Sequence, residues 1–248
     1  ESDGEEYDGY AAEINSIDGQ QFTPSSFGEV DSTTNRWIPK AYSASTTTPA
    51  VSHVSNATDD VNRSAYTFSS QALGAAASDR RIVVAVGGGG GSTATASGVT
   101  VGGVTATLVV NGALEFEQES SIWWAEVPTG TTGDVVVTFT GTKGDCGISC
   151  YRLTGADIVL STVIDTATGS GTAVTGTVGS TGNSVVIGNA FWAGQALRTT
   201  TWTNLTEDVD QEVEGQPLAF KMQSTASAVI TGTSVVVTAT PSGATEQE

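Results

Sequence analysis

Short apolar runs, separated by glycine and turn residues, repeat along most of the chain, and the longest series covers residues 79–141. Residues 82–86 are β-branched or small and apolar, and residues 104–108 alternate apolar with polar side chains. An alternation at period two is typical of a strand with one buried face. The dipeptide Asn111-Gly112 predicts a two-residue hairpin, because both of its turn positions need a positive φ.

The same pattern continues to residue 242, and no helical periodicity exceeds about two turns. Residues 184–191 are nearly all apolar, which predicts a central strand covered on both faces. Further strands are predicted at residues 66–68, 99–101, 122–124, 133–139, 147–153, 158–164, 173–178, 198–204, 218–222, 228–230 and 234–239. About a dozen short strands favour an all-β fold, a jelly-roll-like antiparallel β-sandwich of two sheets.

The chain divides by pattern into an arm, a domain and a tail. Residues 1–50 form an irregular N-terminal arm and linker, residues 51–242 the β-sandwich domain, and residues 243–248 a polar tail. The arm begins with an acidic stretch, and its apolar residues are spaced too irregularly for one helix or strand. An irregular segment this rich in aromatic residues is seldom a free loop. Its predicted docking anchors, on the sandwich or on a neighbouring subunit, are Phe22, Phe27, Trp37 and Ile38.

Composition narrows the choice of partners. The chain has 248 residues, of which 15% are charged, and its net charge is -18. Binding to nucleic acid or to an anionic membrane surface requires clustered Lys and Arg, so neither partner is expected. The charge is compatible with a saline habitat, where salt screens the repulsion. No run approaches the roughly 20 apolar residues of a membrane span. The chain starts at Glu1, as expected of a processed chain or a segment of a longer one.

Two blocks of sequence resemble phage proteins. Residues 17–42, IDGQQFTPSSFGEVDSTTNRWIPKAY, are similar to a segment that recurs in tail-fibre and virion-surface proteins of marine bacteriophages. The motifs DRRIVVAV (79–86), VTVGGVTAT (99–107), IWWAEVPTGTTGDVVVTF (122–139), YRLTGA (151–156) and WTNLTED (202–208) look like a phage β-sandwich module. These motifs are turns, strand edges and packing tryptophans. After the W-x-P-K segment the chain departs from the pattern and continues as SASTTTPAVSHV.

The resemblance implies a non-enzymatic structural protein on the surface of a virion, either a tail fibre or host-attachment component or a capsid decoration protein. We expect a homo-oligomer, with a trimer favoured, because the arm needs partners to cover its aromatic residues. An alternative from another class is a carbohydrate-binding adhesive module of a cell surface or filament. A third hypothesis is a glycan-cleaving enzyme, which would need a pair of carboxylates in a cleft.

Candidate catalytic groups are few. Gly87 to Gly91 are not followed by Lys-Ser or Lys-Thr, so we interpret them as a flexible surface loop and not as a phosphate-binding loop. His53 is the only histidine and lies in a linker-like stretch, and the sequence contains no G-x-S-x-G motif. We therefore expect neither a catalytic triad nor a zinc site. We predict no catalytic residues and no cofactor.

Two groups of carboxylates are candidate sites. Glu115, Glu117 and Glu119 are predicted on one strand face, about 7 Å apart. That spacing overlaps the separation in an inverting glycosidase, but equivalent environments favour a solvated acidic face. Asp208, Asp210, Glu212 and Glu214 alternate with other residues, and the first three are candidate Ca²⁺ ligands. The favoured interpretation of that stretch is an exposed loop.

Tryptophans and cysteines complete the candidates. Because Trp123 and Trp124 are adjacent, one is expected to face the core and the other outward. Trp124 and Trp202 are candidate glycan contacts, although core or interface packing is the preferred role. Cys146 and Cys150 would be too far apart for a disulfide in an extended strand, whereas a turn at Gly147 would bring them together. Buried free thiols are the preferred state.

Overall fold

The computed structural model describes residues 28–39, 48–112, 117–155, 173–180, 183–194, 198–216 and 219–242. The chain forms two compact units, Glu1–Thr46 and Thr47–Glu248. No helix occurs within those described ranges, and all strand pairs are antiparallel. In the described part, no helix is long and apolar enough to cross a membrane.

The described part of the first unit is a small hairpin. Strand β1 (Gly28–Val30) pairs with β2 (Trp37–Pro39), whereas the sequence pattern predicted irregular structure here. The Asp31 carboxylate accepts hydrogen bonds from the N–H groups of Thr33 and Thr34, at 2.7 and 3.1 Å. Asn35 has a φ of 56°, a conformation that Asn tolerates better than most residues. Local turn chemistry, which hydrophobic spacing does not reveal, therefore closes the hairpin.

The first half of the second unit is a jelly roll of nested antiparallel pairs. From the outside inward, the pairs are β3 (Ala50–Asp59) with β11 (Asp145–Thr154), β4 (Arg63–Ala72) with β10 (Thr132–Lys143), β5 (Arg81–Gly89) with β9 (Glu119–Glu126), and β6 (Ala96–Val101) with β7 (Val104–Thr105). Strand β8 (Thr107–Asn111) extends the sheet beyond β9. The sheet orders are β3-β11-β5-β9-β8 and β4-β10-β6-β7. Such a hairpin, rolled into two facing sheets, is a jelly roll.

The predicted alternation builds the core of this jelly roll. On the outer strands β4 and β10, apolar side chains at alternate positions point between the two sheets and polar ones point outward. Fully buried members of the core include Tyr66, Ile82, Val84, Val86, Val99, Val101, Val135, Val137 and Ile148. The jelly-roll prediction is therefore confirmed, but over residues 50–154 and not over the whole of 51–242.

The remaining strands form a second, smaller sandwich. Its two sheets are β13 (Ser184–Gly194), β16 (Ala219–Ile230) and β15 (Thr206–Gln216) in one, and β12 (Val174–Gly179), β17 (Ser234–Pro241) and β14 (Thr200–Thr203) in the other. Val186, Leu205, Ala226, Trp192, Met222 and Ala239 are buried between them. The predicted strand at 158–164 lies outside the described residues.

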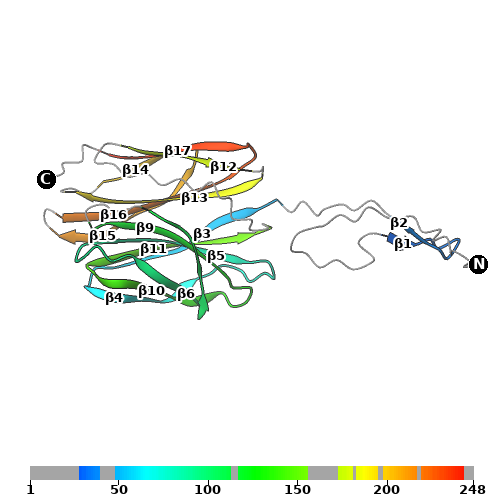
Figure 1. Cartoon of the computed structure of the whole chain (residues 1–248), viewed down its shortest axis with the longest axis horizontal. Coiled ribbons are helices and arrows are strands. Elements are labelled where there is room, and N and C mark those ends of the chain that lie inside the picture. The colour runs from blue at the N-terminus through cyan, green and yellow to red at the C-terminus, as the bar shows by residue number, and fades with distance from the viewer. Residues whose placement is uncertain are drawn as a thin grey trace, which may run out of the picture. The chain divides into compact units, whose positions relative to one another are not determined.

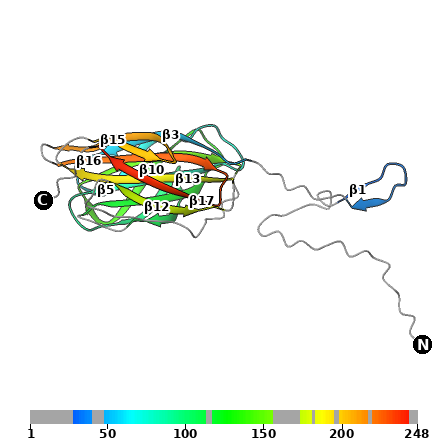
Figure 2. The same ribbon diagram turned by 90° about the horizontal axis from the view of Figure 1, so that it is seen from above.

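The two sandwiches stack, so that the second unit has four sheet layers where the sequence predicted two (Figure 1). The outer layers are the sheets of β4 and β17, and the inner layers are the sheets of β11 and β16. Figure 2 shows the same layers from above, with β17 and β13 overlying β10 and β5. Strand β13 is covered on both faces, as predicted, but it is an edge strand, and β16 is central.

Two turn predictions near β5 and β8 are wrong. Gly87, Gly88 and Gly89 belong to β5 and are buried, and only Gly90 and Gly91 form a turn with positive φ. Asn111 pairs with Ser121, so the ladder continues through the predicted two-residue turn, and the connection runs on through residues 113–116, which are not described. A local turn signal was outweighed by strand pairing in each case.

Candidate functional site

The N-terminal hairpin carries both of the predicted docking residues that the structure describes. Trp37 is 51% exposed and Ile38 39%, and Val30 on the facing strand is 58% exposed. The Trp37 indole lies across Gly28, where a Cβ atom would come within 2.0 Å of the ring. The other two anchors, Phe22 and Phe27, lie outside the described residues. Val30 and Trp37 are paired across the hairpin and so share one face, whereas Ile38 lies on the other, and all three are exposed.

Both candidate glycan-binding tryptophans lie between sheets. Trp124 packs against the cluster of Val83, Tyr151 and Leu153 between the two sandwiches, with the Arg81 guanidinium 5.7 Å from its ring centroid. Trp202 lies inside the second sandwich and donates a hydrogen bond from Nε1 to Ser224 Oγ at 2.8 Å. Each indole ring is half-buried. A sugar could therefore stack on less of its face than on the face of a tryptophan that points into solvent.

The acidic stretch predicted to be a loop is strand β15, and of its four carboxylates only Asp210 and Glu212 stand two positions apart on an uninterrupted ladder. Bulges interrupt its pairing between Glu207 and Val209 and between Glu212 and Glu214. Asp210 accepts the N–H of Thr200 at 2.7 Å, while Glu212 is exposed. No cluster of three or more His, Cys, Asp or Glu residues able to hold a metal occurs in the described ranges. The calcium prediction therefore gains no support from this strand.

The acidic face predicted for Glu117 and Glu119 is also wrong, because the two side chains lie in different environments. Glu117 is exposed, whereas Glu119 is 1% exposed and accepts a hydrogen bond from the Ala96 N–H at 2.6 Å. Burial raises the pKa of the Glu119 carboxyl above its usual range. Lys143, also buried, donates from Nζ to the carbonyl oxygens of Ser92 and Glu117. Glu115 lies outside the described residues.

The cysteines and the histidine serve in packing. Cys146 and Cys150 are buried free thiols on the extended strand β11, as preferred from the sequence. His53 lies on β3, not in a linker, and its Nε2 is 3.4 Å from Ser149 Oγ. Ser149 is fully buried, and Thr225 donates a hydrogen bond to its hydroxyl at 3.1 Å. A hydroxyl placed in this way packs the interface and is out of reach of a substrate.

A buried network of amide side chains joins the two sandwiches. Gln223 Nε2 donates to the backbone oxygen of Ala85 at 3.2 Å and to Asn189 Oδ1 at 3.0 Å. Gln211 Nε2 donates to Gln223 Oε1 at 2.7 Å, and Asn56 Nδ2 donates to Gln211 Oε1 at 2.7 Å. These residues come from five strands of the two inner sheets, namely β3, β5, β13, β15 and β16. Buried amides of this kind need their partners, so the network fixes how the sheets stack.

Glycines allow the inner sheets to approach closely. A Cβ atom at Gly87 would lie 2.3 Å from the Phe191 ring, and one at Gly147 would lie 2.7 Å from Gln223 Oε1. No side chain larger than hydrogen fits at either position without displacing its neighbour. The glycine run of β5 thus gives a contact surface for the second sandwich.

One ion-pair cluster crosses this interface. Lys221 on β16 reaches β11, where its Nζ lies 2.5 Å from Asp145 Oδ2, and it also pairs with Glu214 on β15. Burial raises the pKa of the Asp145 carboxyl to about 6. Burial acts to lower the pKa of Lys221, but its hydrogen bonds to the two carboxylates outweigh burial and raise that pKa.

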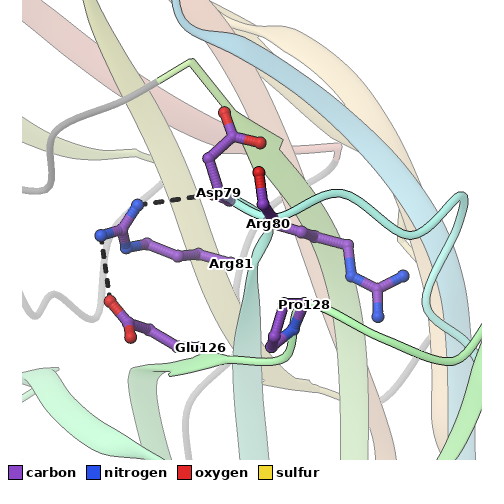
Figure 3. Close-up of a pocket in the computed structure, with 6 residues that line it drawn as sticks. Asp79, Arg80, Arg81, Glu126 and Pro128 are labelled. Atoms are coloured by element: carbon purple, nitrogen blue, oxygen red, sulfur yellow. Dashed lines mark hydrogen bonds and ion pairs between the residues drawn. The ribbon is translucent and has the colours of Figure 1, made fainter.

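A shallow pocket lies at one end of the jelly roll, and Figure 3 shows that the two arginines beside it point in opposite directions. Arg80 is 1% exposed and donates to the carbonyl oxygens of Leu73, Gly74, Val127 and Thr129. Arg81 pairs with Glu126 at 3.0 Å. The buried guanidinium of Arg80 therefore holds two loops together through hydrogen bonds to their backbone.

Sequence reasoning missed the interface between the sandwiches. The residues from Gln223 to Ser227 lie between the predicted strands at 218–222 and 228–230, whereas in the structure β16 continues through them. The available signal was polar but uncharged side chains between two apolar runs, which suits a strand facing a buried polar surface. Comparison with known proteins finds no match, whether with protein-family models, curated proteins or solved structures.

Proposed function

We propose that the chain is a non-enzymatic structural protein of a bacteriophage virion, and that it acts in a tail fibre or in host attachment. The observation that carries the proposal is the apolar hairpin of Val30, Trp37 and Ile38, set in a segment that resembles phage tail-fibre proteins. Exposed aromatic and aliphatic side chains grouped on a small hairpin favour a protein partner.

The second unit supports a mechanical role. Its buried polar and charged side chains are engaged in holding layers and loops together, as the Gln223 network and Arg80 illustrate. A stack of two sandwiches with such contacts is a rigid body, suited to bearing load or presenting a surface. A homo-oligomer follows from the hairpin, whose apolar side chains sister subunits would cover, and a trimer is favoured. Sedimentation at micromolar concentration tests this, and a monomer would contradict it.

The deciding experiment is to locate the protein in intact virions by cryo-electron microscopy with local averaging. Density for the four-layer body at a tail tip or baseplate is expected. Density at the symmetry axes of the capsid lattice would overturn attachment in favour of capsid decoration. Absence from virions, together with density in a cellular filament, would overturn the phage assignment and favour a carbohydrate-binding adhesin.

A further inference from the structure

A lysine, an aspartate and a glutamate meet in the interface between the sandwiches. The side chain of Asp145 is fully buried, whereas those of Lys221 and Glu214 are 13% and 20% exposed. Lys221 Nζ lies 2.5 Å from Asp145 Oδ2, and Glu214 Oε2 contacts the same nitrogen. The Gly89 N–H donates to the other oxygen of the aspartate, Oδ1, at 3.0 Å. Every one of these groups sits on a strand.

We propose that Lys221 and Asp145 join in an intramolecular isopeptide bond, and that Glu214 transfers the protons for its formation. The bond would link β16 of the second sandwich to β11 of the jelly roll. This inference rests on the geometry of the interface and is independent of the proposed virion function.

The reaction is a dehydration that needs no other reactant. Nζ first passes a proton to Asp145 Oδ2, which leaves a neutral amine beside a neutral carboxylic acid. The lone pair of Nζ then attacks Cγ, while the charge that develops on Oδ1 is held by the Gly89 N–H. Glu214 takes a second proton from Nζ and returns it to Oδ2, which leaves as water. An amide and an ionised Glu214 remain, so the net charge of the cluster does not change.

The site holds its reactants close together, with the carboxyl group that is attacked fully buried. Reacting atoms about 3–3.5 Å apart in a fixed orientation react as if at very high concentration. Nζ lies 2.5 Å from Oδ2, an oxygen that is bonded directly to the carbon that Nζ would attack. Burial, which raises the pKa of Asp145 to about 6, favours the neutral acid that the first step requires.

The glycine run gives Lys221 its path to the aspartate. A Cβ atom at Gly89 would lie 2.7 Å from Lys221 Cδ, and one at Gly90 would lie 2.6 Å from Nζ. A side chain at either position would therefore obstruct the lysine. The Phe191 ring, 3.1 Å from the same point above Gly89, borders the lysine stem with an apolar surface. The two glycines and the Phe191 ring therefore leave room for the lysine side chain beside the carboxyl group.

The test is the mass of the intact full-length protein, measured after denaturation on fresh and on aged samples. Bond formation removes one water, so the chain should be lighter than its sequence mass by about 18 Da. Trypsin should then fail to cleave after Lys221 and release a branched species, with residues 144–152 joined to residues 199–248. Fragmentation of that species locates the bond.

Two variants and a matched control sharpen the result. Lys221→Arg should restore the full mass, and Glu214→Gln should leave most of the protein unmodified. Lys143→Arg changes another buried lysine and should keep the loss of water. An unmodified wild-type mass with cleavage after Lys221 would overturn the proposal. A loss of water that persists in Lys221→Arg would do so as well, since dehydration at an Asp-Gly pair such as Asp18-Gly19 has the same mass. If a variant fails to fold, the wild-type peptide map decides alone.

Discussion

At the scale of single residues, two glycines on strands of the jelly roll differ in the space beside them. Gly87 lies under the Phe191 ring, whereas a Cβ atom at Gly98 would meet nothing within 4 Å. Neither glycine has a positive φ, so the backbone accepts alanine at both positions. The space above each residue therefore decides the effect of adding a methyl group.

We predict that Gly87→Ala lowers the free energy of unfolding by about 1–3 kcal/mol, because the added methyl forces Phe191 to move. Gly98→Ala, the matched control, should raise it by about 0.4–1 kcal/mol by restricting the unfolded chain. Urea unfolding of the two variants beside the wild type measures both changes. Equal effects at the two sites would contradict close packing of the inner sheets.

His53 makes a prediction about pH. Burial holds its pKa below the ordinary value of 6.5, although the charge of Asp208 opposes this shift. Below pH 6.5 the unfolded chain therefore binds a proton that the folded chain lacks, so His53 lowers the free energy of unfolding as the pH falls. Urea unfolding at pH 7.5 and pH 5.5 should show a larger loss for the wild type than for His53→Gln. Equal losses would mean that the histidine titrates alike in both states.

At the scale of elements, Arg80 holds one end of the jelly roll together. Its guanidinium joins the segment after β4 to the loop after β9 through backbone oxygens alone. Lysine cannot reach all of these acceptors, because its three donors sit on one atom. Arg81, next in the chain, instead makes a partly exposed pair with Glu126.

We predict that Arg80→Lys costs about 2 kcal/mol or more of the free energy of unfolding, since buried carbonyl groups lose their partners. Arg81→Lys, the control at the neighbouring position, should cost less than about 1 kcal/mol. Thermal unfolding ranks the two variants. A similar loss in both would show that the loops are held by other contacts.

Strand prediction succeeded or failed at this scale for a physical reason. The alternation around Val135 and Val137 predicted β10 correctly, because one face of that strand is buried and the other is exposed to solvent. The same reasoning missed Gly87 to Gly89 and Gln223 to Ser227, which are covered on both faces by other layers. An alternating pattern identifies a strand with one buried face. It does not show whether a sheet distant in sequence also covers the other face of the strand. The uncharged polar run could have indicated a buried strand, but the sequence pattern does not show that this strand packs on β5 and β11 or that Lys221 meets Asp145 there.

At the scale of the whole molecule, the contact between the sandwiches contains a buried polar part beside the apolar cluster around Trp124. Gln223 is 0% exposed, as are Ser149 and Thr225 facing each other across the interface. A buried polar contact holds two bodies in one register, since any sliding would leave donors and acceptors unpaired. This coupling should make the two sandwiches unfold together although each has a core of its own.

We therefore predict one cooperative transition for the second unit, with hydrogen exchange in β5 and β16 reporting the same opening free energy. Gln223→Leu should break the coupling, because it leaves Ala85 O, Asn189 Oδ1 and Gln211 Nε2 short of a partner. We expect a cost of about 2–4 kcal/mol and earlier exchange in β16 than in β5. Gln71→Leu, on the outer strand β4, should leave the two strands coupled. If the wild type already exchanges in two separate steps, the network does not join the sandwiches, and their stacking depends on the apolar contacts around Trp124 and Val185.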